Sequence, residues 1–218
     1  TAGDFFHLIS LIFTLWCTIC SWGTKHLCDC LMVRRAKRPE RSRGSSLNLY
    51  APGLLPSPMQ IAVIGRGNCS DEEYAAAETI GRLIAGNRAT VCCGGLGGVM
   101  EAACRGAKGG GGTTVGILPD TGDGNAYLDV VVRTGMGHAR NIILVHSADA
   151  VIAVGGGYGT LSEIAVALKM GKPVYGLATW KIEGVMACAG PEEAVSLAVR
   201  AGRLSRPSRS PRGLGGSA

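Results

Sequence analysis

Three glycine-rich turns are the parts of this sequence best placed to do chemistry. Each stands between an apolar run and a segment with helical spacing. Backbone without a Cβ lets an anion come close, and the N–H groups and dipole of the following helix bind phosphate without a cationic side chain. The turns therefore predict a site for a phosphorylated ligand, although they could also serve only as tight connections. The predicted phosphate-binding residues are Gly65, Gly67, Gly94, Gly95, Gly97, Gly98, Gly156, Gly157, Gly159 and Thr160.

Three side chains near these turns could contribute to the site. Thr160 is predicted to be the N-cap of a helix, and its hydroxyl is also in place to bind phosphate. Glu163 either completes a capping box with Thr160 or faces the ligand, and the two roles do not exclude each other. Arg140 is expected at the start of another helix, where the dipole disfavours a cation. We therefore predict an anionic partner for Arg140, the alternative being a solvated surface arginine.

Other phosphate-binding motifs and metal sites are not supported by the sequence. The first turn, Gly65-x-Gly67-x-x-Ser70, lacks the third glycine of the dinucleotide fingerprint, and no acid follows the second strand to hold a ribose. The pattern of a P-loop NTPase is absent. His138 and His146 are not at metal-ligand spacing. We predict no metal site and no required cofactor.

Strands alternate with helices through the middle of the chain. Continuous runs of Val, Ile and Ala indicate strands that are buried on both faces, which is typical of a parallel sheet. The sequence predicts an α/β fold, a single Rossmann-like doubly wound parallel sheet with helices on both faces. Such sheets bind ligands at the carboxyl ends of their strands. We expect strands at 60–65, 89–93, 113–118, 127–132, 149–154 and 173–177, and helices at 70–87, 99–108, 138–147, 160–170 and 191–201.

Composition divides the 218 residues into three segments. Residues 1–58 hold an apolar run at 5–24 and then a basic linker. This segment either anchors the chain in a membrane, with the following domain on the cytoplasmic side, or is upstream sequence from an over-extended gene model. Its four cysteines could form a zinc quartet, but the first pair lies in the apolar run. Residues 59–203 are the predicted nucleotide-binding domain, and residues 204–218 a disordered basic tail.

The net charge of +6 belongs to the two ends of the chain. Residues 59–203 hold 12 Lys and Arg against 13 Asp and Glu, a net charge of −1. The domain therefore lacks the basic surface expected of a nucleic-acid-binding protein, and no nucleic acid partner is predicted. Adjacent Cys92 and Cys93 would point to opposite faces of a strand, which suits buried, reduced thiols. This favours a cytoplasmic protein.

Several motifs together resemble the LOG-like superfamily over about residues 59–201. They are the run from Gly94 to Met100 (GGLGGVM), the segment 107–118, Arg140, and the run from Gly156 to Glu163 (GGYGTLSE). The name-giving members are cytokinin riboside 5′-monophosphate phosphoribohydrolases, and DNA-processing protein A is a distant relative. The most similar branch is a small single-domain one that includes molybdenum cofactor carrier proteins. The resemblance implies a homo-oligomer and makes the molybdenum cofactor a possible bound ligand.

The resemblance also implies roles for individual residues. Arg140 and Glu163 would flank the ribose, Glu163 helping to expel the base and Arg140 orienting the substrate, with the phosphate on the turn from Gly156 to Thr160. The sequence departs from the hydrolase pattern twice, with Gly155 in place of a proline and Asn141 in place of a lysine. Both departures count against hydrolysis and leave phosphate binding unaffected. Binding of a purine or pterin phosphate therefore ranks ahead of phosphoribohydrolase activity.

Overall fold

The computed structural model of the protein describes residues 58–205. The predictions for the apolar run, the cysteine quartet, the basic linker and the C-terminal tail lie outside these residues, apart from the last residues of α6. Within the described part, no helix is both long and apolar enough to cross a membrane.

The described residues form a seven-stranded sheet in the order β4-β3-β2-β1-β5-β6-β7, and all neighbouring strands are parallel. The strands are β1 (Gln60–Gly65), β2 (Thr90–Cys93), β3 (Thr114–Leu118), β4 (Val130–Arg133), β5 (Ala150–Val154), β6 (Val174–Leu177) and β7 (Val185–Ala187). The helices are α2 (Asp71–Gly86), α3 (Val99–Gly109), the 3-10 turn η1 (Gly137–Ala139), α4 (Arg140–Ser147), α5 (Tyr158–Lys169) and α6 (Pro191–Ser205).

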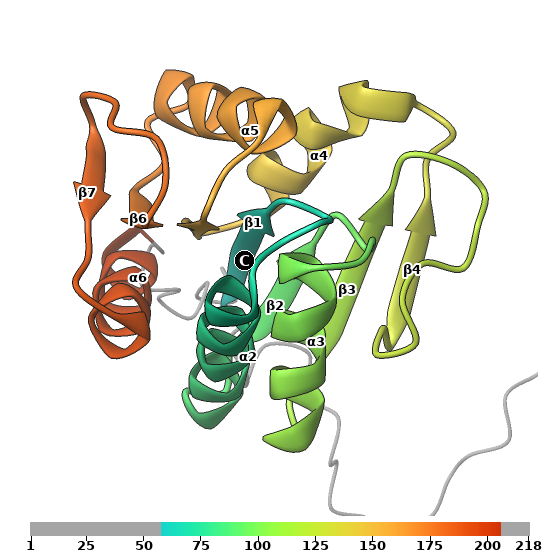
Figure 1. Ribbon diagram of the computed structural model, residues 1–218, viewed down its shortest axis with the longest axis horizontal. Helices are drawn as coiled ribbons and strands as arrows, with labels where there is room; N and C mark the ends of the chain where they lie inside the picture. Colours follow the sequence, from blue (N-terminus) through green and yellow to red (C-terminus); the bar gives the residue numbers. More distant parts are fainter. Residues whose placement is uncertain (1–57, 206–218) are drawn as a thin grey trace, which may run out of the picture. The chain divides into compact units, whose positions relative to one another are not determined.

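Helices cover both faces of the sheet, which confirms the predicted doubly wound fold (Figure 1). One hydrophobic core joins α2, α3 and α6 to one face, and a second joins α4 and α5 to the other. Neighbouring residues of a strand serve different cores, because side chains alternate across a sheet. Cys93 lies in the first core and Cys92 in the second, so the two thiols point to opposite faces as predicted.

The start of α2 and its packing against α3 both follow from local sequence features. The Ser70 hydroxyl accepts a hydrogen bond from the Glu73 backbone N–H, and the Glu73 carboxylate accepts one from the Ser70 backbone N–H. The predicted capping box at the start of α2 is therefore formed. Helices α2 and α3 then pack backbone against backbone. A Cβ at Gly81 would overlap the carbonyl oxygen of Ala103, and one at Gly106 would overlap that of Glu78. The glycines thus permit the close approach of the two helices.

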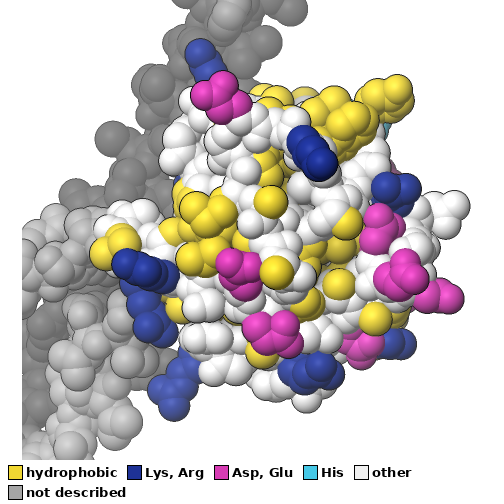
Figure 2. Space-filling model, turned by 60° about the vertical axis from the view of Figure 1, so that its left-hand side comes forward, with side chains coloured by type: hydrophobic (Ala, Val, Ile, Leu, Met, Phe, Trp, Pro, Cys, Tyr) yellow, Lys and Arg dark blue, Asp and Glu magenta, His cyan; other side chains and the backbone are white. Residues whose placement is uncertain are grey.

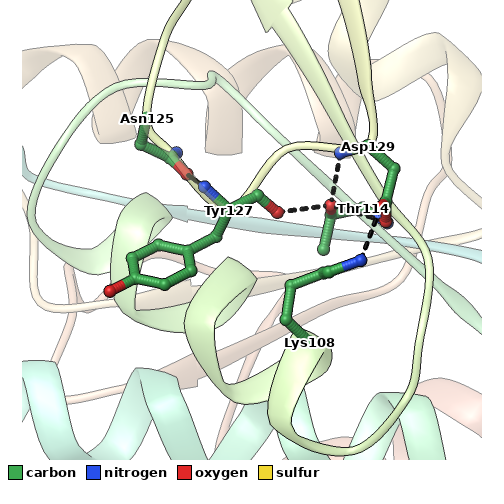
Figure 3. Close-up of polar contacts among 5 residues, drawn as sticks. All are labelled: Lys108, Thr114, Asn125, Tyr127 and Asp129. Carbon is green, nitrogen blue, oxygen red and sulfur yellow. Dashed lines mark hydrogen bonds and ion pairs between the residues drawn. The ribbon is translucent and has the colours of Figure 1, made fainter.

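The predicted strand at 127–132 is displaced, because its first residues are bound by polar contacts outside the ladder. Figure 3 shows these contacts. The Thr114 hydroxyl donates to the carbonyl oxygen of Tyr127, and the Asp129 carboxylate accepts from the Thr114 backbone and from Lys108. Strand β4 therefore begins only at Val130. The pKa of Asp129 lies below its usual value, and the hydrogen bond from Lys108 is the largest cause.

An unpredicted strand and several shifted helix ends are the other main differences from the predictions. Helix α4 begins at Arg140, after a 3-10 turn, instead of at 138. Strand β7 was not predicted, since it has three residues and lies at the exposed edge of the sheet. Helix α6 continues to Ser205, beyond the predicted end at 201. Helix α5 begins at Tyr158, two residues before the predicted start at Thr160.

Candidate functional site

The three glycine turns meet at the carboxyl edge of the sheet. Strand β1 is the switch point, because it pairs with β2 on one side and with β5 on the other. Its last residue, Gly65, stands opposite Val154 at the end of β5. The backbone N–H of Val99 donates to the carbonyl oxygen of Arg66, so the first and second turns are in contact. This edge is where open α/β sheets place their ligands.

Arg140 and Glu163 form a buried ion pair at this edge. An Arg140 guanidinium nitrogen lies 3.2 Å from the Glu163 carboxylate, and their side chains are only 7% and 8% exposed. The surface-arginine alternative for Arg140 is therefore wrong, and Glu163 is its anionic partner within the chain. An anionic ligand for Arg140 stays a prediction. The guanidinium also lies across Gly94, where any Cβ would collide with it. The Arg140 Nε is buried and has no hydrogen-bond partner among the described residues.

Burial makes Glu163 an unusually weak acid for a carboxyl group. Burial raises the pKa of Glu163 to about 7, and the Arg140 guanidinium limits that rise. Burial outweighs the ion pair because a carboxylate without water has few other groups to stabilise its charge. Both protonation states of Glu163 are thus accessible near neutral pH, a property common at functional sites.

Thr160 is not the N-cap of α5, and the predicted capping box with Glu163 does not form. The cap is Gly157, and its carbonyl oxygen accepts the first helical bond from Leu161 at 2.9 Å. Thr160 is the third residue of the helix and is buried at 2% exposure. Glu163 lies one turn further on and reaches Arg140 of α4 instead of the helix start. The carboxylate is therefore directed to the site and plays no part in capping.

The glycines of the site divide into two groups. At most positions a side chain would strain the backbone or strike the protein itself. A Cβ at Gly155, where φ is +59°, would overlap the Glu73 carboxylate, and one at Gly156 would lie 2.6 Å from the Trp180 indole nitrogen. At Gly67, Gly157 and Gly159 the space within 4 Å is empty of protein atoms. The positions at which a Cβ would strike the protein are Gly65, Gly94, Gly95, Gly98, Gly155 and Gly156. A Cβ at Gly97 would make only an ordinary van der Waals contact.

The two departures from the hydrolase pattern have structural reasons. Proline holds φ near −65°, so it cannot stand at Gly155 while the backbone keeps φ at +59°. Asn141 is buried, and its amide nitrogen donates to the Ser162 hydroxyl at 3.0 Å. The asparagine thus ties α4 to α5 and leaves no cationic side chain at this position.

Sequence reasoning missed the residues that follow β6. Thr179 and Trp180 stand at the carboxyl end of that strand, beside the third glycine turn. The Trp180 indole nitrogen donates to the Gly157 carbonyl oxygen at 3.4 Å, and its ring stacks with that of Tyr158 at 6.4 Å between centroids. The signal was available, because polar and aromatic residues directly after a parallel strand belong to the ligand-binding edge.

Metal ligands are not gathered at this edge. Among residues 58–205, no group of three or more His, Cys, Asp or Glu side chains is arranged to hold a metal ion. Cys93 and Cys104 lie 3.4 Å apart between sulfur atoms in the first core, behind the second turn. The hydrogen bond between the two thiols lowers the pKa of Cys93 and raises the pKa of Cys104, and it is the largest cause of both shifts.

Known proteins are similar to this chain in sequence, and two with solved structures are similar in fold as well. An uncharacterised protein of Archaeoglobus fulgidus is 53% identical over 143 residues, which cover 65% of this chain and 95% of that protein. The molybdenum cofactor binding protein of the phototrophic bacterium Rippkaea orientalis is 37% identical with a TM-score of 0.62, covering 64% of this chain and 94% of that one. The molybdenum cofactor carrier protein of Chlamydomonas reinhardtii is 32% identical with a TM-score of 0.62, covering 66% and 98%.

The matched region coincides with the described sheet and its glycine turns. The sequence pattern of the SLOG cluster4 family fits residues 58–201. This range begins just before β1 and ends within α6, so it includes the three turns, Arg140 and Glu163. The chain belongs to the SLOG cluster4 family, as the resemblance to the LOG-like superfamily led us to expect.

Proposed function

We propose that the protein binds a phosphorylated nucleotide-like ligand, with the phosphate on the turn between β5 and α5. The observation that carries the proposal is the empty space at Gly157 and Gly159. Neither residue has a positive φ, and alanine would fit at both without touching protein atoms. The fold itself does not require glycine there, whereas a bound anion does, because it approaches the backbone N–H groups at the start of α5.

The buried pair supports the same location. Arg140 has one bond to Glu163 and an unpartnered Nε, which is an unusual state for a buried guanidinium. Thr160 and Glu163 lie three residues apart on α5, and therefore on the same side of the helix. The similarity to proteins that bind or carry the molybdenum cofactor favours a pterin phosphate as the ligand class, with a purine nucleotide as the second choice.

Thermal unfolding of the full chain with purine nucleoside 5′-monophosphates and a pterin phosphate tests the proposal. A ligand at one hundred times its Kd stabilises the folded state by about 2.7 kcal/mol, which corresponds to a rise in Tm of roughly 5–10 °C for a domain of this size. Gly157→Ala and Gly159→Ala should leave the Tm of the free protein unchanged or slightly higher, and should abolish most of the ligand-induced rise.

Gly109→Ala is the matched control, because this helical glycine also has no protein atom within 4 Å of its missing Cβ and lies outside the glycine turns. It should keep the full response to ligand. The proposal fails if Gly157→Ala and Gly159→Ala respond to ligand as the unchanged chain does, or if none of the phosphates stabilises the protein.

Phosphoribohydrolase activity is the second candidate, and the pKa of Glu163 favours it. With a pKa of about 7, the carboxyl can donate a proton to a departing base or stabilise an oxocarbenium-like transition state as an anion. Hydrolysis ranks second because Glu163 is already paired with Arg140 and only 8% exposed. Release of free base from nucleoside monophosphates, lost in Glu163→Gln, would establish the activity. Binding without release would leave the protein a carrier or sensor.

A further inference from the structure

We propose that Trp180, together with Tyr158 and Thr179, recognises the planar heterocycle of the ligand. This inference rests on the proposed function and adds the part of the site that reads the ring. The phosphate turn alone cannot distinguish one phosphorylated compound from another, because backbone N–H groups contact only the anion. Selection of a purine or pterin therefore needs a flat aromatic surface beside the turn.

Trp180 provides such a surface at the right place. Its indole nitrogen lies 3.4 Å from the Gly157 carbonyl oxygen, and it fills the space that a Cβ on Gly156 would occupy. The indole is thus held directly against the turn whose next residues are the empty positions of the phosphate site. It is still 39% exposed, so the ring is not part of the hydrophobic core.

Tyr158 extends the aromatic surface of the subsite. Its side chain is 85% exposed at the first position of α5, although the ring is large and apolar. The centroids of the two rings are 6.4 Å apart, and their planes differ by 27°. The two rings stack on each other, so together they form one aromatic surface, and a flat heterocycle would lie against its exposed side.

Thr179 supplies a polar group that the protein leaves unused. Its Oγ1 is buried and has no hydrogen-bond partner among the described residues. It lies 3.5 Å from the position that a Cβ on Gly156 would take, so it belongs to the same corner of the site. Buried hydroxyls are rarely left unpaired, and the nitrogen or oxygen atoms on the edge of a heterocycle would provide the partner.

The backbone just before Thr179 and Trp180 has a strained conformation. Ala178 has φ of +47°, in the left-handed region that a residue with a side chain seldom adopts. This turn at the end of β6 places Thr179 and Trp180 against Gly156, in the turn that follows β5. Strain of this kind is concentrated at functional sites, where a particular placement of side chains is needed.

A pocket of about 490 Å³ adjoins Trp180 and Thr179 and is otherwise lined by residues of β6, β7 and the segment between them, and by Cys188. Neither Tyr158 nor the glycine turn lines it, so a ring in this pocket would meet the indole and Thr179. This volume is within the range of small-molecule sites. In Figure 2, which brings the β7 side of the molecule forward, hydrophobic side chains reach the surface near the top, at the height where α5 lies in Figure 1.

The test compares guanosine 5′-monophosphate with ribose 5-phosphate on the full chain. Guanine shares its amino and oxo groups with a pterin, whereas ribose 5-phosphate offers the anion without a ring. Trp180→Ala should weaken binding of guanosine 5′-monophosphate about tenfold, within the range for a base stacked on an aromatic side chain, and should change the affinity for ribose 5-phosphate less than twofold. Tyr158→Ala, at a nearly fully exposed position, should do the same to a smaller extent without affecting folding.

Fluorescence gives an independent signal. The difference in emission between the unchanged chain and Trp180→Phe isolates Trp180 from the other two tryptophans. Guanosine 5′-monophosphate should quench this emission, and ribose 5-phosphate should not. Equal affinity for the two ligands, with no quenching and no effect of either variant, would overturn the inference and leave the phosphate site intact. Failure of both ligands to bind would overturn the proposed function and this inference with it.

Discussion

Arg140 and Glu163 are arranged less well than a stabilising pair would be. A guanidinium can form two parallel bonds to a carboxylate, but only one is present, at 3.2 Å, and the Arg140 Nε remains unpaired. Burying two charges costs more than such a contact returns, and replacement of buried pairs by apolar residues is often neutral. The pair is therefore better explained by a role toward a ligand than by a contribution to stability.

This explanation predicts a particular double-mutant cycle. Near neutral pH, Arg140→Met alone should destabilise the fold by less than the roughly 3–5 kcal/mol of a broken permanent ion pair, because the buried Glu163 carboxyl can take up a proton. The loss should be larger as the pH is raised. Arg140→Met combined with Glu163→Leu should restore most of that loss, since neither charge is then buried. Chemical denaturation measures all four proteins. A double variant that stays several kcal/mol less stable than the unchanged chain would show that the pair stabilises the fold after all.

The raised pKa of Glu163 predicts how stability depends on pH. Folding favours the protonated form, so the contribution of this group is fully present below pH 4.5 and is lost as pH rises toward its folded pKa of about 7. The difference in unfolding free energy between the unchanged chain and Glu163→Gln should therefore fall by about 3 kcal/mol across that interval. Denaturation at a series of pH values measures it. A difference that grows with pH would mean that Arg140 keeps Glu163 ionised throughout.

At the scale of elements, the spacing of α2 and α3 depends on two glycines. Gly106→Ala should destabilise the protein by about 1–3 kcal/mol, because its methyl group would overlap the Glu78 carbonyl of the neighbouring helix. Gly109→Ala, in the same helix but without neighbours within 4 Å, should be neutral or stabilising by up to ~1 kcal/mol. Thermal or chemical unfolding compares the two. Equal effects would show that the helices can separate freely.

The order of elements was predictable because buried parallel strands and amphipathic helices have strong periodic signals. The start of α5 was not, because Gly157 caps without a side chain, and the misleading pattern Thr160-x-x-Glu163 is local. The true partner of Glu163 comes from 23 residues earlier in the chain. Contacts between distant residues also explain why the sequence does not reveal the contact of Gly94 with Arg140 or that of Trp180 with Gly156. The position of Trp180 directly after a strand could still have marked it as a residue of the site.

At the scale of the whole molecule, the site lies at the centre of the sheet, and exposed apolar residues also lie on both edge strands, Val130 and Val132 on β4 and Met186 on β7. The topology places β1 and β5 side by side in the middle, so the turns of the site come from both halves of the chain. The outer strands β4 and β7 each lack a neighbour on one side among the described residues. An uncovered apolar edge favours pairing with another chain.

Strand β4 is the edge at which we expect self-association. Val130 and Val132 are on the same face of the strand and are 47% and 39% exposed, and Met136 beyond it is 52% exposed. We predict that the protein is a homo-oligomer that buries this face, and that Val132→Glu shifts it to a monomer without loss of secondary structure. Sedimentation equilibrium at micromolar concentration, with Met186→Glu on the opposite edge as control, measures the change. A chain that is monomeric before any substitution would exclude the predicted assembly, whereas a monomer produced only by Met186→Glu would move the interface to β7.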